Sequence, residues 1–216
     1  MAGRYHNIDD LPPTLGIFPL TGVLLLPRGQ LPLNVFEPRY LTLVEEALSG
    51  SRMIGMIQPV EHEDKALKPA LTAIGCAGRI TGYRETDDNR YLITLTGICR
   101  FRVATEIAVS TPFRQVAADY KPFAGDLVER DDGDFPRERL LAALNEYLQR
   151  RELKADWRSV MNAPAETLVN ALAMLCPFEP NEKQALLEAP GWPERVNTLL
   201  ALLEMASAAT GSNTVK

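Results

Sequence analysis

The spacing of apolar residues changes from a period of two to a helical period partway along the chain. The clearest alternation falls in residues 99–109, where Cys99 and Phe101 alternate with Arg100 and Arg102. A period of two predicts a strand with one face on a core and the other face toward solvent. We therefore expect both arginines to be exposed to solvent.

Further apolar runs predict a mostly β first half of the chain. Residues 27–29 (PRG) predict a turn between the first two runs, because proline fixes φ and glycine relieves the backbone after it. Gly75 and Gly78 predict a bulge or a sharp bend in the run that contains them. The expected strands cover residues 15–20, 31–36, 52–58, 71–81, 90–96, 99–109 and 111–120.

Helical spacing occurs once in the first half and four times in the second. The first helix is expected to begin at Pro38, which suits a first helical turn, and to end at Ser49-Gly50. After residue 135, apolar residues recur at i, i+3, i+4 and i+7, which predicts helices that pack on one another. Their stripes are Leu140, Leu141, Leu144, Tyr147 and Leu148; Leu168, Val169, Leu172 and Leu175; Ala185, Leu186 and Leu187; and Val196, Leu199, Leu200 and Leu203.

Residues 121–135 separate the two patterns. This segment, KPFAGDLVERDDGDF, is charged, contains Gly and Pro, and has no period, so it predicts a linker. The chain of 216 residues, 46% of them hydrophobic, has an ordinary globular composition and is long enough for one large or two small domains. We expect an α+β protein with a β domain at 14–120, a linker at 121–135 and a helical bundle at 136–210.

The order of several motifs resembles one protein family. F-P-L, L-P-R-G-Q and L-P-L-N-V-F-E-P-R-Y follow one another within residues 18–40, G-I-C-R-F-R-V begins at Gly97, and P-A-E-T-L-V-N-A-L-A-M-L-C-P-F covers residues 164–178. Together they resemble the amino-terminal domain of Lon-type ATP-dependent proteases and the stand-alone bacterial proteins that carry this domain alone. The resemblance implies a PUA-like β pseudo-barrel followed by a carboxy-terminal helical bundle.

The same resemblance implies a binding protein rather than an enzyme. In the full-length proteases this domain binds unfolded or tagged polypeptide, while other domains hydrolyse ATP and cleave peptides. The chain contains no G-x-x-x-x-G-K-[ST] phosphate loop. We expect a non-catalytic protein without a cofactor that recognises unfolded or apolar polypeptide segments or a protein partner. The first residues, MAGRYHNIDDLPP, do not resemble a signal peptide, and no apolar run is long enough for a membrane span, so a cytoplasmic location is expected.

The histidines and cysteines offer little catalytic or metal-binding chemistry. His6 lies in an amino-terminal arm, and His62 lies in a polar stretch that is typical of a solvated loop. The three cysteines, Cys76, Cys99 and Cys176, are widely spaced and form no C-x-x-C pair, so reduced, buried thiols are the favoured interpretation. We therefore expect neither a catalytic residue nor a metal site.

The segment FEPRY holds the first candidate binding residues. In the structural interpretation, Phe36 and Tyr40 pack into the core while Glu37 and Arg39 fix the corner between strand and helix. The truncation Phe36→Ala would then destabilise the fold by about 3–5 kcal/mol. In the functional interpretation, part of the segment lines a peptide groove, since aromatic and arginine side chains are common binding hot spots.

A group of arginines in neighbouring β segments gives the second set of candidates. They are either ordinary solvent-facing residues or a shallow basic face for an acidic peptide or RNA. The 11 basic and 11 acidic residues between Thr14 and Tyr120 make the β domain neutral overall, which weakens the RNA alternative. The arginines are Arg79, Arg84, Arg90, Arg100 and Arg102, and the combined candidates for peptide binding are Phe36, Arg39, Tyr40, Arg79, Arg100 and Arg102.

Overall fold

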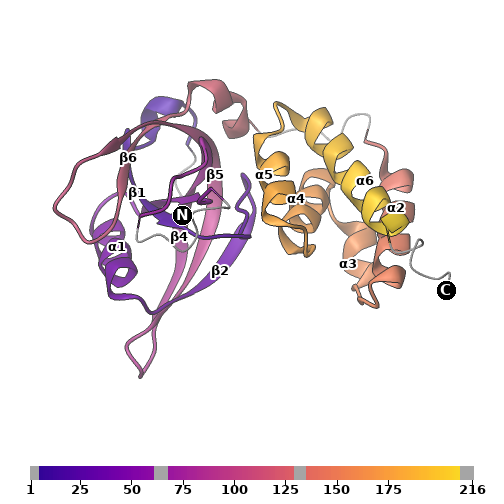
Figure 1. The fold of residues 1–216 in the computed structure, drawn as a ribbon, viewed down its shortest axis with the longest axis horizontal. Helices are drawn as coiled ribbons and strands as arrows, with labels where there is room; N and C mark the ends of the chain where they lie inside the picture. Colours follow the sequence, from indigo (N-terminus) through magenta and orange to yellow (C-terminus); the bar gives the residue numbers. More distant parts are fainter. Residues whose placement is uncertain (1–4, 61–67, 129–134, 210–216) are drawn as a thin grey trace. The chain divides into compact units, whose positions relative to one another are not determined.

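The computed structural model describes residues 5–60, 68–128 and 135–209 and divides the chain into two compact units. The first unit, Met1–Glu129, carries the strands, and the second, Arg130–Lys216, carries a group of helices (Figure 1). The α+β class expected from the sequence is confirmed. His62 lies outside the described residues.

The first unit is a pseudo-barrel in which one long strand closes the ring. Six strands have the order β2-β5-β4-β3-β1-β6, and β6 also pairs with β5, so that β5, β4, β3, β1 and β6 form a closed circuit. The strand β2 pairs with the first part of β5, and β6 pairs with its last part. The strands are β1 (Thr14–Pro19), β2 (Gln30–Val35), β3 (Met53–Ile57), β4 (Ile74–Glu85), β5 (Tyr91–Ile107) and β6 (Gln115–Asp119).

The strand β5 runs unbroken through Gly97, where the sequence predicted two separate strands. A Cβ atom at Gly97 would collide with the carbonyl oxygen of Leu26, because the turn after Leu26 lies directly on the strand. The Arg28 N–H donates to the Gly97 carbonyl at 2.7 Å, and the Gly97 N–H donates to the Gly29 carbonyl at 2.9 Å. The glycine therefore permits the close approach of this turn rather than ending the strand.

The pairing of β4 with β5 is irregular next to Gly78. The register shifts between Ala77 and Gly78 and again between Ile80 and Gly82. The bulge or bend predicted from Gly75 and Gly78 is thus confirmed. Such irregularities increase the local twist, which helps a long strand pair to bend around a barrel.

The helix α1 (Pro38–Ser49) packs against β1 and β3. Its first residue is the proline expected from the sequence, and its buried side chains are Tyr40, Leu43, Val44 and Ala47. The helix α1 is therefore held against the strands by one apolar face.

The first part of the segment predicted to be a linker belongs to the β unit. Lys121–Leu127 form the 3-10 helix η3, in which Phe123 and Asp126 are buried. A short 3-10 helix, η1 (Ile8–Asp10), lies near it. No apolar period predicts η3. Its Asp126 instead pairs with Arg100, 26 positions earlier in the chain, and its Phe123 packs into the barrel core.

The second unit contains five α-helices in its described part, one more than the sequence predicted. The additional helix is α3, which has six residues and no buried residue, so it is too short to show a repeated apolar period. In this unit α2 and α5 pack on α6, and α4 contacts both α5 and α6. The helices are α2 (Arg137–Arg150), α3 (Trp157–Asn162), α4 (Ala165–Leu175), α5 (Pro180–Glu188) and α6 (Trp192–Ala209). Within the described residues, no helix combines the length and apolarity that crossing a membrane would require.

Candidate functional site

Phe36 is exposed, and the expectation that it packs into the core is wrong. Its side chain is 61% exposed, although the preceding residue, Val35, is buried at the end of β2. Because successive strand residues point to opposite faces, burial of Val35 directs Phe36 outward. The guanidinium of Arg90 lies 5.6 Å from the Phe36 ring centroid, a cation–π contact at the surface.

Tyr40 is buried, as the structural interpretation of FEPRY expected. Its ring centroid lies 4.1 Å from that of Phe18, and burial raises the pKa of the Tyr40 hydroxyl. Arg39 lies 4.4 Å above the Tyr40 ring and forms a 2.8 Å ion pair with Glu37. Glu37 and Arg39 therefore join the two sides of the strand-to-helix corner, while Tyr40 is too buried to meet a ligand in this structure.

Arg100 is buried, and the expectation that it faces solvent is also wrong. Its side chain is 3% exposed and forms an ion pair with Asp126 of η3 at 2.8 Å. The Arg100 guanidinium also lies 4.6 Å from the centroid of the Phe123 ring. The helix η3 covers Arg100 on the face of β5 that the alternation assigned to solvent, so Arg100 cannot take part in a surface site.

The remaining arginines do not form one basic face. Arg79 donates to the Tyr5 hydroxyl at 2.6 Å, and Arg102 is exposed near the end of β5. Arg84 and Arg90 are exposed at the opposite end of the β4–β5 pair, where Arg90 forms an ion pair with Asp88 at 2.8 Å. The structure therefore does not bring the arginine candidates together.

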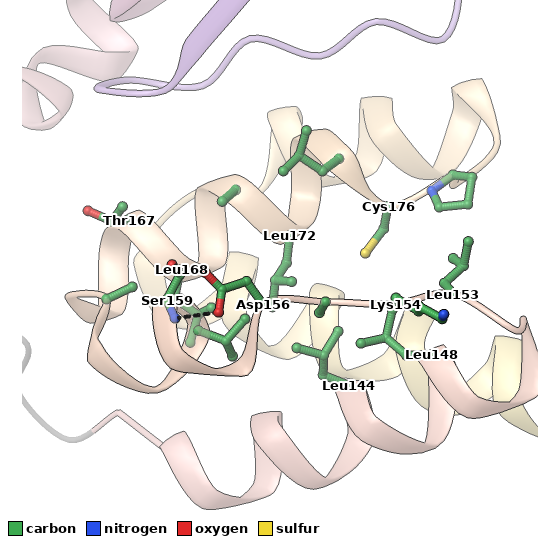
Figure 2. A pocket seen from close by; sticks show the side chains of 16 residues that line it. Leu144, Leu148, Leu153, Lys154, Asp156, Ser159, Thr167, Leu168, Leu172 and Cys176 are labelled. Carbon is green, nitrogen blue, oxygen red and sulfur yellow. Dashed lines mark hydrogen bonds between the residues drawn. The ribbon is translucent and has the colours of Figure 1, made fainter.

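An apolar hollow in the described part of the helical unit forms a groove that no pattern in the sequence indicated. Its cavity volume is about 700 Å³, and it lies among α2, α3 and α4 and the segment that joins α2 to α3 (Figure 2). We call it the helical groove. It is lined by Leu144, Leu148, Leu153, Lys154, Ala155, Asp156, Ser159, Val160, Ala163, Thr167, Leu168, Ala171, Leu172, Leu175, Cys176 and Pro177.

Aliphatic side chains form the floor and one rim of the helical groove. Figure 2 shows Leu144 and Leu148 of α2 directed toward Leu172 of α4, with Leu168 alongside. Leu175, at the end of α4, is 81% exposed although it continues the apolar stripe of that helix. The stripe predicted from the sequence was therefore correct, but its last residue reaches the groove rather than the core.

Polar contacts position α3 as a wall of the helical groove. The Asp156 carboxylate caps its amino-terminal end and accepts from the Arg158 N–H at 3.1 Å and the Ser159 hydroxyl at 2.6 Å. At the other end, Nη2 of Arg137 donates to the carbonyl oxygens of Met161 at 2.8 Å and Ala163 at 2.7 Å. Because α3 has no fully buried residue, these polar contacts help to hold it beside the groove.

The groove offers apolar contact and little reactive chemistry. Burial raises the pKa of the Cys176 thiol to about 11, so this thiol is protonated near neutral pH and is a poor nucleophile. The hydrogen bond from Ser159 lowers the pKa of Asp156, which keeps that carboxylate ionised as the cap of α3. Across the described part of the chain, no three His, Cys, Asp or Glu side chains are grouped so as to hold a metal ion.

A second hollow lies on the sheet of the first unit and is more polar. Its cavity volume is about 480 Å³, and Asn34, Arg84 and Thr94 contribute to its lining together with Leu33 and Leu92. It lies where β2, β5 and β4 run side by side. Its mixed lining is less suited to an apolar ligand than the helical groove is.

Comparison with known proteins identifies relatives across both units. The family described as the ATP-dependent protease La (LON) substrate-binding domain matches residues 14–205. The Lon protease of Desulfosudis oleivorans is 31% identical over 119 residues, which cover 52% of this chain and 15% of that protein. The Lon protease of Dictyoglomus thermophilum is 25% identical over 221 residues, which cover 94% of this chain and 26% of that protein. The chain thus spans about a quarter or less of these curated relatives.

Solved structures support the fold assignment. A Lon N-terminal domain protein from Xanthomonas campestris superposes with a TM-score of 0.58 at 25% identity, covering 87% of this chain and 97% of that one. The N-terminal domain of the Mycobacterium avium complex Lon protease gives a TM-score of 0.61 at 16% identity, covering 90% of this chain and 98% of that one. Both units of the chain therefore have counterparts in solved Lon N-terminal domains.

Proposed function

Because this chain belongs to the Lon substrate-binding domain family, we propose that it binds exposed apolar segments of unfolded polypeptides through the helical groove. The family supports a substrate-binding role. The aliphatic lining of the groove is the single observation on which we choose it as the binding surface. The proposal involves no chemical step, no cofactor and no metal. A cytoplasmic location stays a prediction.

Exposure of leucine around the groove supports this proposal. Leu175 is 81% exposed, and Leu153, which lines the same groove, is also exposed. Covering a Leu side chain stabilises a complex by about 1.5–3 kcal/mol. An exposed apolar surface that adjoins a concave apolar lining is typical of a ligand-binding groove.

The size of the groove predicts modest affinity. A volume of about 700 Å³ admits a few side chains rather than a folded domain. Burial of two or three aliphatic side chains is partly offset by the loss of translational and rotational freedom on association. We expect dissociation constants on the order of micromolar for a single short segment.

Binding of an unfolded protein tests the proposal directly. Fluorescein-labelled, reduced and carboxymethylated α-lactalbumin is titrated with the full chain, and fluorescence anisotropy reports the complex. Leu175→Lys places a charge in the groove at an exposed position and should weaken binding at least about tenfold. Met205→Lys changes another exposed apolar residue of the same unit, outside the groove, and should leave binding unchanged. Equal affinities for these two variants would contradict the choice of surface.

A further inference from the structure

The geometry points to an amphipathic helix as the preferred occupant of the helical groove, with one aliphatic stripe and an acidic residue beside it. This inference rests on the proposed function and specifies the class of polypeptide segment that it selects. Three features of the groove support it: the backbone of its walls, the chemistry of its lining and the position of its one ammonium group.

The backbone of the walls favours an occupant that satisfies its own hydrogen bonds. Most lining residues belong to α2, α3 and α4. Their N–H and C=O groups are largely bonded within the helix or, at the two ends of α3, to the side chains of Asp156 and Arg137. An extended segment in such a groove would bury its own unpaired N–H and C=O groups, and each unpaired group costs about 1–3 kcal/mol. A helix pairs these groups internally. Only the run 153–156 offers several consecutive lining residues outside helices.

The lining chemistry favours aliphatic side chains on one face of the occupant. The described residues of the lining are mainly Leu, Ala and Val, and none is aromatic. Residues at i, i+3, i+4 and i+7 form such a face on a helix about 10–12 Å across. Insertion of an apolar helical face into a groove is a recurrent mode of peptide recognition. Two turns of such a helix would present the few side chains that the groove can admit.

Lys154 gives the groove a charge preference. It supplies the only ammonium or guanidinium group among the described lining residues, and its side chain is exposed. The nearby carboxylate of Asp156 already caps α3 through the Ser159 hydroxyl and the Arg158 N–H. An acidic residue flanking the stripe of the occupant can therefore pair with Lys154 at the edge of the groove.

Two peptide isomers test the inference. Each has about 14 residues of identical composition (Leu, Ala, Gln and one Glu), long enough for about four helical turns. In one, leucines recur at i, i+3, i+4 and i+7 with Glu beside them; in the other, leucines alternate with polar residues. Anisotropy titration of the labelled peptides with the full chain should show at least about tenfold tighter binding of the helical isomer. Circular dichroism should show that its helix content rises on binding.

Two groove variants and one control variant assign that binding to the groove. Leu175→Lys should weaken binding of the helical isomer at least about tenfold, while Met205→Lys should not change it. Lys154→Glu should weaken binding of the Glu peptide severalfold and strengthen binding of a matched peptide in which Lys replaces Glu. Unchanged binding in Leu175→Lys would overturn the inference, because the helix would then occupy another surface.

The remaining outcomes separate the inference from the proposed function. Equal or tighter binding of the alternating isomer would overturn the helix preference while leaving polypeptide binding in place. Failure of both isomers and of carboxymethylated α-lactalbumin would reject the proposed function itself. A concentration-dependent dimer in sedimentation velocity that Leu175→Lys abolishes would assign the groove to a second copy of this chain, and would also overturn the inference.

Discussion

The carboxylate of Asp126 holds Arg100 at three points. It accepts from Nε at 2.8 Å, from Nη2 at 2.9 Å and from the Arg100 backbone N–H at 3.0 Å. A third residue joins this arrangement, because Nη1 of Arg28 donates to the Asp126 carbonyl oxygen at 2.6 Å. These bonds join η3 to β5 and to the turn before β2. The last element of the β unit is thereby packed against the strands of the barrel.

Removal of the Asp126 charge should destabilise the β unit strongly. Asp126→Asn leaves the buried guanidinium of Arg100 uncompensated, and breaking a buried ion pair from one side costs about 3–5 kcal/mol. Urea unfolding followed by far-ultraviolet circular dichroism measures the loss. The double variant Arg100→Met, Asp126→Leu should recover part of it, because an apolar pair avoids the buried charge although it leaves the Arg100 backbone N–H unpaired. A loss below about 1 kcal/mol in Asp126→Asn would show that solvent reaches the pair.

Truncation of Phe36 should have little effect on stability, in contrast to the expectation from the sequence. The side chain is exposed, and surface substitutions usually change the free energy of unfolding by less than about 0.5 kcal/mol. The cation–π contact with Arg90 adds about 0.5–1 kcal/mol at most. Phe101→Ala in the barrel core is the matched comparison and should cost about 3–5 kcal/mol. Similar losses in the two variants, measured by urea unfolding, would argue against the exposed position of Phe36.

Much of the fold follows from periodicity, whereas the buried polar pair and the groove do not. The strand and helix patterns and the register shift at Gly78 are local features that the sequence displays directly. Exposure of Phe36 continues the alternation of β2 past Val35 and is itself a local feature. Burial of Arg100 instead depends on Asp126, which lies in a segment without a period. The helical groove requires the short helix α3, which has no buried residue, to lie beside α4. Such features arise from contacts between distant segments, which local patterns do not encode.

Glu106 should make the stability of the β unit sensitive to acid. Hydrogen bonds from Arg114, and then from Lys68, lower the pKa of Glu106 from its usual 4.5 to about 2. Because the pKa of Glu106 is lower in the folded state, its ionised carboxylate stabilises the fold above about pH 4.5. This stabilisation is lost as the pH falls toward 2. Glu106→Gln lacks it at every pH. We expect this variant to be about 1 kcal/mol less stable than the wild type at pH 7, a value reduced by partial exposure of the pair.

Urea unfolding as a function of pH measures this contribution. The difference in free energy of unfolding between the wild type and Glu106→Gln should narrow as the pH falls from about 4.5 toward 2. Glu204→Gln provides the control, since its partner Arg139 is exposed and such pairs contribute little at any pH. A difference that stays constant across this range would show that the effect of Glu106→Gln does not come from the ionised carboxylate.

Salt should distinguish apolar polypeptide binding from RNA binding. Phosphate contacts release counterions, so RNA affinity would fall steeply as salt rises from about 0.05 to 0.5 M, while apolar burial persists or strengthens. We expect the affinity for carboxymethylated α-lactalbumin to be maintained across this range, and a labelled oligouridine to bind weakly throughout. The double variant Arg79→Glu, Arg102→Glu should leave polypeptide binding intact; Arg100 is omitted because reversing its buried charge would disrupt the fold. Tight oligouridine binding that salt and these two substitutions abolish would favour an RNA-binding face on the β unit instead.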